Sequence, residues 1–380
     1  MKNVLLIFLL LIAFGTNAQY NIRLVVTDVA TKRNEDIYVT GNFNNWNPQD
    51  EKYKLKVSGP NIKAVVIKDV PAGNYAFKFT RGSFDKVECA ADGKDIEDRV
   101  MDIQADVSAE LKIEGWKDDY PQRPKRYTAS PNVKIMDTAF QIPQLNRKRR
   151  IWIYLPKSYA VSSKTYPVMY MHDGQNLFND QTAAFGEWGV DECLDSLQQK
   201  TGKETIVVGI DNGGDKRMTE YNPYDNIQFG KEEGKEYIEF IVKNLKPYID
   251  TKYRTKKSAP YTFIAGSSMG GLISLYAIIH YPEVFGGGGI YSPSLWIAPQ
   301  LYDAAIKFNP LTVQPAFYFY AGGSESATMV GDLKKMYDIL QQKKSCKLVE
   351  VINPLGQHSE KYWRQDFPNF YSWLMSVTPN

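Results

Sequence analysis

A serine flanked by glycines in the second half of the chain is the clearest sign of chemistry. The motif Gly266-Ser267-Ser268-Met269-Gly270 follows an apolar run over 261–265 and precedes an apolar helical run over 272–279. A Gly-x-Ser-x-Gly pattern between a strand and a helix is typical of a nucleophile elbow, a strained turn that exposes the serine hydroxyl. The spacing selects Ser268, because Ser267 lacks the two flanking glycines. We therefore predict Ser268 as a nucleophile.

The base for this serine must come from a very short list, since the chain has only three histidines. A serine hydroxyl is a weak nucleophile until an imidazole accepts its proton. His172 ends an apolar strand and His280 closes the helix after the elbow, and structural roles explain both positions. His358 directly follows the last apolar strand, in the sequence Gly356-Gln357-His358-Ser359. Because α/β-hydrolases place their base after the last strand, we predict His358 as the general base.

The third member of such a triad is a carboxylate, which orients the imidazole and offsets its positive charge. In α/β-hydrolases this acid lies between the serine and the histidine in the chain. Glu325 satisfies that order, in a glycine-containing turn after the apolar run 317–320, and Asp332 lies further along, in the next helical segment. We predict Glu325 as the acid and keep Asp332 as the alternative. A structural role for Glu325, as an acid near a helix start, also fits.

Backbone amides must stabilise the negative oxygen that forms during acyl transfer. The amide after the nucleophile, that of Met269, is one predicted donor. The second should come from the loop after the strand that ends at His172, which reads Asp173-Gly174-Gln175-Asn176. A plain polar turn is the alternative interpretation of this loop.

Strands and helices alternate from about residue 132 onward, which is the arrangement these residues require. Compact apolar runs separate helical segments such as 232–248, whose apolar residues recur every three or four positions. Strands that alternate with helices predict a mostly parallel sheet covered on both faces, here a doubly wound α/β-hydrolase domain over 132–380. The runs interpreted as strands are 167–171, 205–210, 261–265, 316–320 and 348–352.

Four segments together resemble the esterase D-like family of α/β-hydrolases. The likeness covers about 132–378, and the family includes feruloyl and acetylxylan esterases of carbohydrate esterase family 1, enterochelin esterases and mycolyltransferase antigens. It implies Ser268, Glu325 and His358 as the triad, and the amide of Gln175 as the second oxyanion donor. The segments are Tyr170–Phe178, Gly209–Gly214, Gly266–Gly271 and Tyr291–Trp296.

The chain before this domain has a different texture. Residues 19–118 change between short alternating runs and turns rich in Gly, Pro and Asn, which predicts a small immunoglobulin-like β-sandwich. A polar segment with several prolines, 119–131, is interpreted as the linker.

The predicted sandwich resembles carbohydrate-binding modules of family 48, the glycogen-binding or isoamylase N-terminal type. The segments that carry the likeness are Tyr38–Pro48 and Gly73–Phe79. It implies that Trp46 and Lys78 contact sugar rings, with Phe84 where binding members have a second tryptophan. A purely structural sandwich that shapes the esterase cleft is the alternative.

The first 18 residues are interpreted as an export signal. Lys2 precedes an apolar run over 4–14, and small residues follow it at 16–18. That run is too short to span a bilayer, and no other stretch approaches the required length, so we expect a periplasmic or secreted protein without a membrane span. Cys89, Cys193 and Cys346 lie far apart, which favours buried free thiols over a disulfide scaffold or a metal site.

These observations lead to a hypothesis about function. A formal net charge of +3 gives no basic field for nucleic acid. We predict a serine carboxylesterase that needs no metal or organic cofactor and removes feruloyl or acetyl groups from xylan-type oligo- or polysaccharides, with Asp173, Trp188 and Trp296 at the substrate site. Both tryptophans also fit a core. The alternatives are a siderophore trilactone esterase and a non-catalytic glycan-binding protein, and the oligomeric state stays open.

Overall fold

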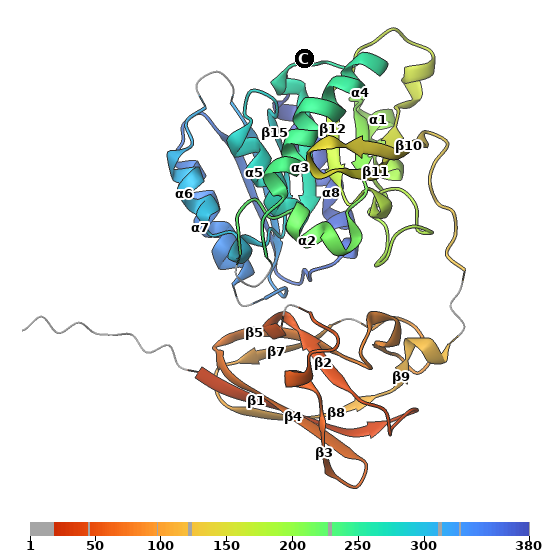
Figure 1. The fold of residues 1–380 in the computed structure, drawn as a ribbon, viewed down its shortest axis with the longest axis vertical. Coiled ribbons are helices and arrows are strands. Elements are labelled where there is room, and N and C mark those ends of the chain that lie inside the picture. Colours follow the sequence, from red (N-terminus) through yellow and green to blue (C-terminus); the bar gives the residue numbers. More distant parts are fainter. Residues whose placement is uncertain are drawn as a thin grey trace, which may run out of the picture. The chain divides into compact units, whose positions relative to one another are not determined.

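The computed structural model describes residues 19–44, 46–96, 98–120, 124–226, 230–310, 314–326 and 328–379. The chain divides into two compact units, 1–121 and 122–380, and each has its own core (Figure 1). The division falls inside the segment that the sequence assigns to a linker. The predicted export signal, 1–18, lies outside the described residues.

The second unit is built on one eight-stranded sheet. Its strands lie in the order β10-β11-β13-β12-β14-β15-β16-β17, and all neighbours from β13 to β17 run parallel. Only β10 and β11 add antiparallel pairs. The mainly parallel α/β sheet predicted from the sequence is confirmed. The bounds are β10 Val133–Ile142, β11 Arg147–Tyr154, β12 Val168–His172, β13 Ile206–Ile210, β14 Thr262–Ser267, β15 Gly287–Tyr291, β16 Ala316–Gly322 and β17 Lys347–Asn353.

Helices cover both faces of this sheet. Alternate residues of each buried strand point to opposite faces, so each strand contributes to two cores. Val168 and Tyr170 of β12 belong to a core shared with α3 to α7, whereas Met169 and Met171 belong to a second core shared with α1 and α8 (Figure 1). The strands are therefore continuously apolar, as buried parallel strands require. The helices are α1 Val190–Thr201, α2 Arg217–Glu220, α3 Gly234–Phe240, α4 Lys246–Lys252, α5 Met269–His280, α6 Gln300–Lys307, α7 Met329–Gln341 and α8 Glu360–Val377.

Two elements differ from the sequence-based expectation. The predicted helix over 232–248 consists of α3, a π-helical turn Ile241–Leu245 and α4, which follow one another without a break. The strand β15 was not predicted, because its sequence starts with three glycines, a residue that disfavours strands. An added Cβ at Gly288 would lie 1.7 Å from the carbonyl oxygen of Ile264 on β14. Glycine is needed there because the two strands leave no room for a side chain.

The first unit contains two main sheets around one core. The four-stranded sheet has the order β3-β4-β1-β8, and the three-stranded sheet has the order β2-β5-β7. Buried side chains from both sheets, together with Trp116, form the core. The bounds are β1 Gln19–Val29, β2 Tyr38–Gly41, β3 Lys56–Gly59, β4 Ile62–Pro71, β5 Gly73–Thr80, β6 Glu88–Cys89, β7 Arg99–Ile103, β8 Val107–Ile113 and β9 Gly115–Trp116.

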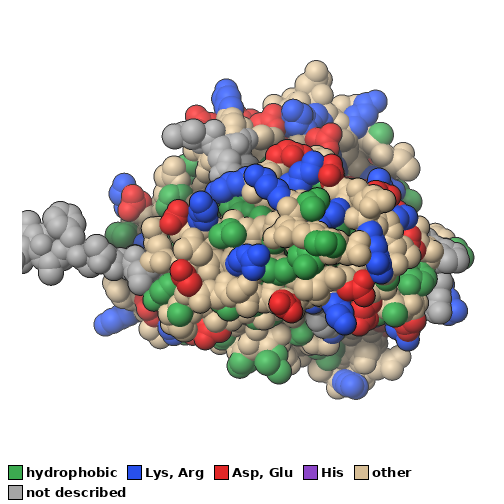
Figure 2. All heavy atoms as spheres, turned by 90° about the horizontal axis from the view of Figure 1, so that it is seen from below, with side chains coloured by type: hydrophobic (Ala, Val, Ile, Leu, Met, Phe, Trp, Pro, Cys, Tyr) green, Lys and Arg blue, Asp and Glu red, His purple; other side chains and the backbone are tan. Residues whose placement is uncertain are grey.

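The outer face of the four-stranded sheet carries a mixed surface. Figure 2 shows basic, acidic and hydrophobic side chains interspersed over it. Val57 on β3 and Val66 on β4 contribute exposed apolar area. This face gathers no single sign of charge.

The cysteines form no disulfide within the described residues. Cys89 is buried, whereas Cys193 and Cys346 are half-buried. Among the helices described, none is both long enough and apolar enough to cross a membrane.

Candidate active site

Ser268 lies at a sharp turn between β14 and α5. Its backbone has φ 59° and ψ −121°, a conformation that costs a non-glycine residue of the order of 1–3 kcal/mol. Neighbouring glycines permit the turn, since an added Cβ at Gly271 would lie 2.7 Å from the carbonyl oxygen of Tyr291. Strain of this kind at a turn that presents a hydroxyl is typical of a nucleophile elbow.

Glu325 and His358 come together at the same edge of the sheet. Glu325 follows β16 and His358 follows β17, and parallel strands bring their carboxyl ends to one edge. The Nδ1 atom of His358 lies 2.8 Å from Oε2 of the buried Glu325. Because a carboxylate only accepts hydrogen bonds, Nδ1 carries the hydrogen and Nε2 is left as the acceptor.

The hydroxyl of Ser268 lies close to the hydroxyl of Ser294, with 3.3 Å between the two oxygens. Within the described residues, no hydrogen bond directly joins Ser268 to His358. Both nevertheless connect to the turn after β15, Ser268 through Ser294 and His358 through Glu325, whose carboxylate accepts from Ser292. In resting enzymes the bond between nucleophile and base is often long and shortens when substrate binds.

The two amides predicted to stabilise a developing negative oxygen both lie at the start of helical turns. Met269 begins α5, and Gln175 belongs to a 3₁₀ turn, Gly174–Asn176, directly after β12. The first N–H groups of a helical turn have no partner within it. In the described part of the chain, neither amide donates a hydrogen bond to another residue. The side chain of Gln175 is itself held, because its Oε1 accepts from the amide of Asn212 at 3.1 Å.

Asp173 anchors this loop. Arg217 of α2 makes two hydrogen bonds to its carboxylate, at 2.7 and 2.8 Å, and the side chain of Asn212 adds a third at 2.7 Å. Burial raises the pKa of Asp173 and the guanidinium of Arg217 lowers it, and the net pKa lies below the ordinary value. The carboxylate is thus ionised and fully engaged. The structure gives Asp173 a role in positioning this loop, and its contact with substrate stays a prediction.

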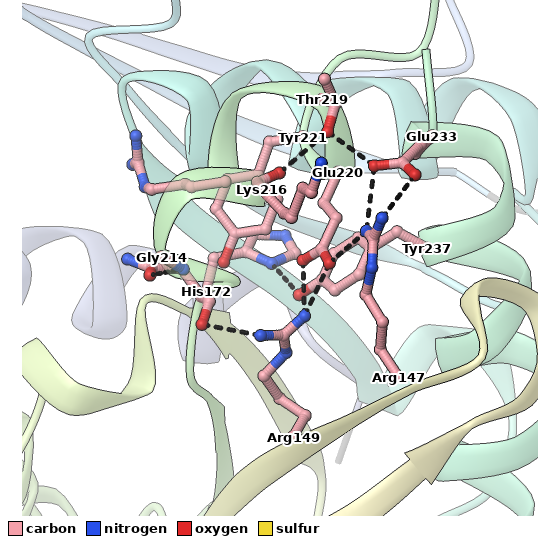
Figure 3. Close-up of polar contacts among 12 residues, drawn as sticks. Arg147, Arg149, His172, Gly214, Lys216, Thr219, Glu220, Tyr221, Glu233 and Tyr237 are labelled. Atoms are coloured by element: carbon pink, nitrogen blue, oxygen red, sulfur yellow. Dashed lines mark hydrogen bonds and ion pairs between the residues drawn. The ribbon is translucent and has the colours of Figure 1, made fainter. Parts of the chain in front are cut away.

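A buried ionic network supports the segment that carries Arg217 (Figure 3). Glu220 is completely buried and accepts hydrogen bonds from Arg147 and Arg149 of β11, at 2.6 to 2.7 Å. Arg147 also pairs with Glu233, at 2.7 Å, and Arg149 donates to the carbonyl oxygen of Asn212 at 2.9 Å. These contacts tie the segment after β13 to the sheet.

The other two histidines have structural surroundings. His172 is buried, its Nδ1 lies 3.0 Å from the hydroxyl of Tyr237, and burial lowers its pKa to about 3. Its ring is therefore neutral at physiological pH. His280 lies at the end of α5, where its ring packs on that of Tyr276 at 4.2 Å.

The predicted substrate-site tryptophans differ in exposure. Trp188 is 3% exposed and packs against Trp363 and Tyr291, as in the alternative core interpretation, and its place at the substrate site stays a prediction. Trp296 is 44% exposed and lies in the short helical turn Leu295–Ile297, next to Ser294. Asp332, the alternative acid, lies in α7 and interacts with Tyr302.

The residues proposed to bind carbohydrate lie in the first unit. Trp46 and Phe84 are half-buried, and Trp46 has φ 56°. Lys78 lies on β5, and its ammonium forms an ion pair with Asp98 at 2.8 Å.

Sequence reasoning missed Arg217, Ser292, Ser294 and Trp363. The segment Tyr291–Trp296 was noticed only for its family likeness. No spacing rule connects Arg217 with Asp173, because the loop between β13 and α2 brings them together.

Three features define the class of α/β ester hydrolases. They are the strained turn at Ser268, the hydrogen bond between His358 and Glu325, and the mainly parallel sheet. Residues 142–374 match the model of the family described as "Putative esterase", and the chain belongs to this family. It is a carboxylic ester hydrolase.

Several known proteins are similar to this chain. The uncharacterized protein YbbA of Bacillus subtilis (strain 168) is 29% identical over 246 residues, which cover 60% of this chain and 92% of that protein. An endo-1,4-beta-xylanase/feruloyl esterase of Xylanibacter ruminicola is 26% identical over 186 residues, 46% of this chain and 24% of that protein. An alpha-amylase of Niallia circulans is 35% identical over 91 residues, 23% of this chain and 7% of that protein.

Among solved structures, the enterobactin esterase FES of Shigella flexneri, determined in the presence of enterobactin, has a similar fold. It is 18% identical with a TM-score of 0.55, and the match covers 90% of this chain and 88% of that one. At this identity the likeness concerns the fold alone.

Proposed function

We propose that the protein is a serine carboxylesterase in which Ser268 attacks the ester carbonyl and forms an acyl-enzyme. His358 accepts the proton of Ser268 through Nε2 and passes it to the leaving alcohol, and Glu325 holds the imidazole and offsets its charge. The amides of Met269 and Gln175 stabilise the tetrahedral oxyanion. Water then gives a proton to His358 while its oxygen attacks the acyl carbon. The bond between the acyl carbon and Ser268 breaks, His358 returns the proton to the oxygen of Ser268, and the carboxylic acid leaves.

One observation carries this proposal. The 2.8 Å contact between His358 and the buried Glu325 lies on the same edge of the sheet as the strained Ser268. A histidine–glutamate pair on an exposed surface would lack both a buried carboxylate and a strained serine at the same edge of the sheet. Here the carboxylate is 2% exposed, and the serine conformation is one that costs free energy.

The test is hydrolysis of p-nitrophenyl acetate by wild type, Ser268→Ala and Ser267→Ala. Removal of the nucleophile should lower kcat by about 10⁴-fold or more, as loss of a triad serine does elsewhere. Ser267 is the neighbouring serine on β14 and serves as the matched control, with nearly unchanged kcat expected. Equal rates for wild type and Ser268→Ala would refute the role of Ser268.

For the substrate, we propose feruloyl or acetyl esters on xylan-type saccharides. The support is the likeness to a relative named endo-1,4-beta-xylanase/feruloyl esterase, together with the exposed Trp296 beside Ser294. An exposed indole offers a flat surface on which a sugar or a phenolic ring can stack.

A second candidate substrate is a siderophore trilactone. Its support is the fold of the Shigella flexneri enterobactin esterase, since the match includes 90% of this chain. Rates on methyl ferulate, acetylated xylan and a catecholate trilactone, measured side by side, decide between the two. Faster cleavage of the trilactone would reverse the order proposed here.

We further propose that residues 19–118 form an immunoglobulin-like sandwich that binds glycan through Trp46, Lys78 and Phe84, and that the protein is exported by a signal at 1–18. The likeness to family 48 modules supports the first point, and the apolar run at 4–14 supports the second. Binding of the whole chain to insoluble xylan and to glycogen, compared for wild type and Trp46→Ala, tests the module. Detection of a chain that begins at Gln19 after export tests the signal.

A further inference from the structure

We propose that the turn Ser292-Pro293-Ser294, directly after β15, is a positioning element that holds both ends of the triad. In this arrangement Ser292 fixes Glu325, and Ser294 fixes the hydroxyl of Ser268. The inference rests on the triad proposed above, and it assigns roles to residues that lie outside the triad.

Ser292 is completely buried and lies between a donor and an acceptor. Its Oγ accepts from the indole Nε1 of Trp363 at 2.9 Å and lies 2.6 Å from Oε1 of Glu325. An indole N–H can only donate and a carboxylate can only accept. The hydroxyl hydrogen of Ser292 must therefore point at Glu325.

This bond determines which oxygen of Glu325 serves the imidazole. Oε1 receives both the Ser292 hydroxyl and the amide of Gly322, each at 2.6 Å, and Oε2 faces Nδ1 of His358 at 2.8 Å. With both donors in place the carboxylate cannot rotate without losing two hydrogen bonds to a charged group. Ser292 thus sets the direction in which the imidazole is held.

Ser294 acts at the other end of the turn. Its Oγ lies 3.3 Å from Oγ of Ser268, and its amide donates to the carbonyl oxygen of Ser268 at 3.2 Å. Ser268 can give its hydrogen to His358 only if its oxygen is the acceptor in the contact with Ser294. We therefore assign the hydroxyl of Ser294 as the donor, which leaves the hydrogen of Ser268 free to point toward the base.

The backbone of the turn is itself constrained. Ser292 has φ 44°, its amide continues the sheet to the carbonyl oxygen of Tyr320 at 2.7 Å, and Pro293 has a fixed φ. The neighbouring strands β12, β14 and β15 are each followed at once by a non-glycine residue of positive φ. Such conformations persist only where surrounding contacts determine them, and they gather at functional sites. The turn after β15 therefore lies at the same edge of the sheet as the nucleophile elbow and shares its constrained backbone.

The experiment measures kcat and KM for p-nitrophenyl acetate from pH 5 to 9. Ser292→Ala should lower kcat/KM by about tenfold or more, because a hydrogen bond to a charged group is lost. Without this donor, the carboxylate of Glu325 stabilises the protonated imidazole more strongly, so the acidic limb of the pH profile should move to higher pH. A purely structural defect would lower the rates at all pH values without moving the limb.

Ser294→Ala should lower kcat by about three- to tenfold and leave KM unchanged, and Ser294→Thr should recover most of the loss, because it keeps the hydroxyl. The control is Ser274→Ala, which removes a buried hydroxyl whose one hydrogen bond among the described residues is to the carbonyl oxygen of Gly270 within α5. Its kcat should stay close to that of wild type.

Trp363→Phe gives a second test of Ser292 if Ser292→Ala folds poorly. It keeps the hydroxyl but removes the donor that directs it, and the acidic limb should again shift. Wild-type kcat, KM and pH profile in folded Trp363→Phe and Ser294→Ala, while Ser268→Ala is inactive, would overturn this inference and leave the proposed triad intact. An active Ser268→Ala would instead refute the triad.

Discussion

The loops on either side of the elbow are held by different forces. β14, which leads directly into Ser268, lies between β12 and β15 in the sheet. The loop after β12 is fixed by ionised groups, since Asp173 binds Arg217 and the segment behind it rests on Glu220 and two arginines. The turn after β15 is fixed by hydroxyls and an indole, and among the described residues its side chains hydrogen-bond to one charged group, Glu325.

Because of this difference, the two halves of the site should respond differently to pH and to substitution. A buried charge that loses its partner is costly, because the remaining ion has neither water nor a counter-ion. A hydroxyl that is lost leaves a small defect of about 1 kcal/mol.

Glu220→Ala should have the largest effect on stability. It leaves Arg147 and Arg149 without their shared buried partner, and breaking a buried ion pair costs about 3–5 kcal/mol. Urea unfolding monitored by fluorescence gives the change in the free energy of unfolding. The control is Glu239→Ala, which removes an exposed helical pair with Lys243 and should cost less than about 0.5 kcal/mol. A loss for Glu220→Ala no larger than that of the control would contradict the view that ions hold this side.

Arg217→Gln should lower the free energy of unfolding by about 2 kcal/mol. This loss is smaller than that of Glu220→Ala because the arginine side chain is partly exposed. In wild type, the lowered pKa of Asp173 contributes stability above about pH 4, and this contribution is lost as the pH falls through the folded-state value. Without Arg217, burial dominates and the sign reverses, so stability should fall as the pH rises above about 4. Unfolding curves from pH 4 to 8 measure the slope. The same slope in both proteins would show that the Asp173–Arg217 pair is not what holds the loop.

Glu360→Gln should stabilise the protein at alkaline pH. Glu360 begins α8, lies 3.5 Å from the side chain of Asn176 in the loop after β12, and burial raises its pKa to about 7. Since the folded-state pKa is raised, ionisation costs stability as the pH rises from about 4 through 7. The variant should therefore gain of the order of 1–2 kcal/mol at pH 8 and nothing near pH 4. A gain that is independent of pH would argue against a buried titrating carboxyl.

Ser294→Ala should have the smallest effect on stability, about 1 kcal/mol, and the same value at pH 5 and pH 8, because no titrating group loses a partner. Thermal unfolding at both pH values is sufficient. If the loss changed with pH, the division into a charged side and a neutral side would fail.

Much of the fold could be predicted because buried parallel strands leave plain apolar runs in the sequence. The runs at 167–171 and 205–210 correspond to β12 and β13 within a residue or two. The strand β15 could not be found this way, because close contact with β14 requires glycine where a strand usually has a branched residue. The π-helical turn before Lys246 also leaves no simple period in the sequence.

The candidate site likewise has features that could be predicted from the sequence and features that could not. Chain order was enough to select Glu325 and His358, which the structure brings within 2.8 Å of each other. Asp173 was selected as well, but its hydrogen bonds to Arg217 could not be predicted, because Arg217 is 44 residues further along the chain. The stacking of Trp188 on Trp363 could not be predicted either, because no pattern in the sequence links the two residues. Contacts that depend on how loops return to the sheet are set by tertiary structure alone.

The glycine at position 288 is a site where a single substitution should inactivate the enzyme. Gly288 faces Ile264 across the β14–β15 pair, and four residues later the chain enters the turn that contacts both Ser268 and Glu325. A single methyl group at 288 would push β15 away from β14. Alanine there would act as an internal wedge that separates nucleophile from acid without altering any group that touches the ester.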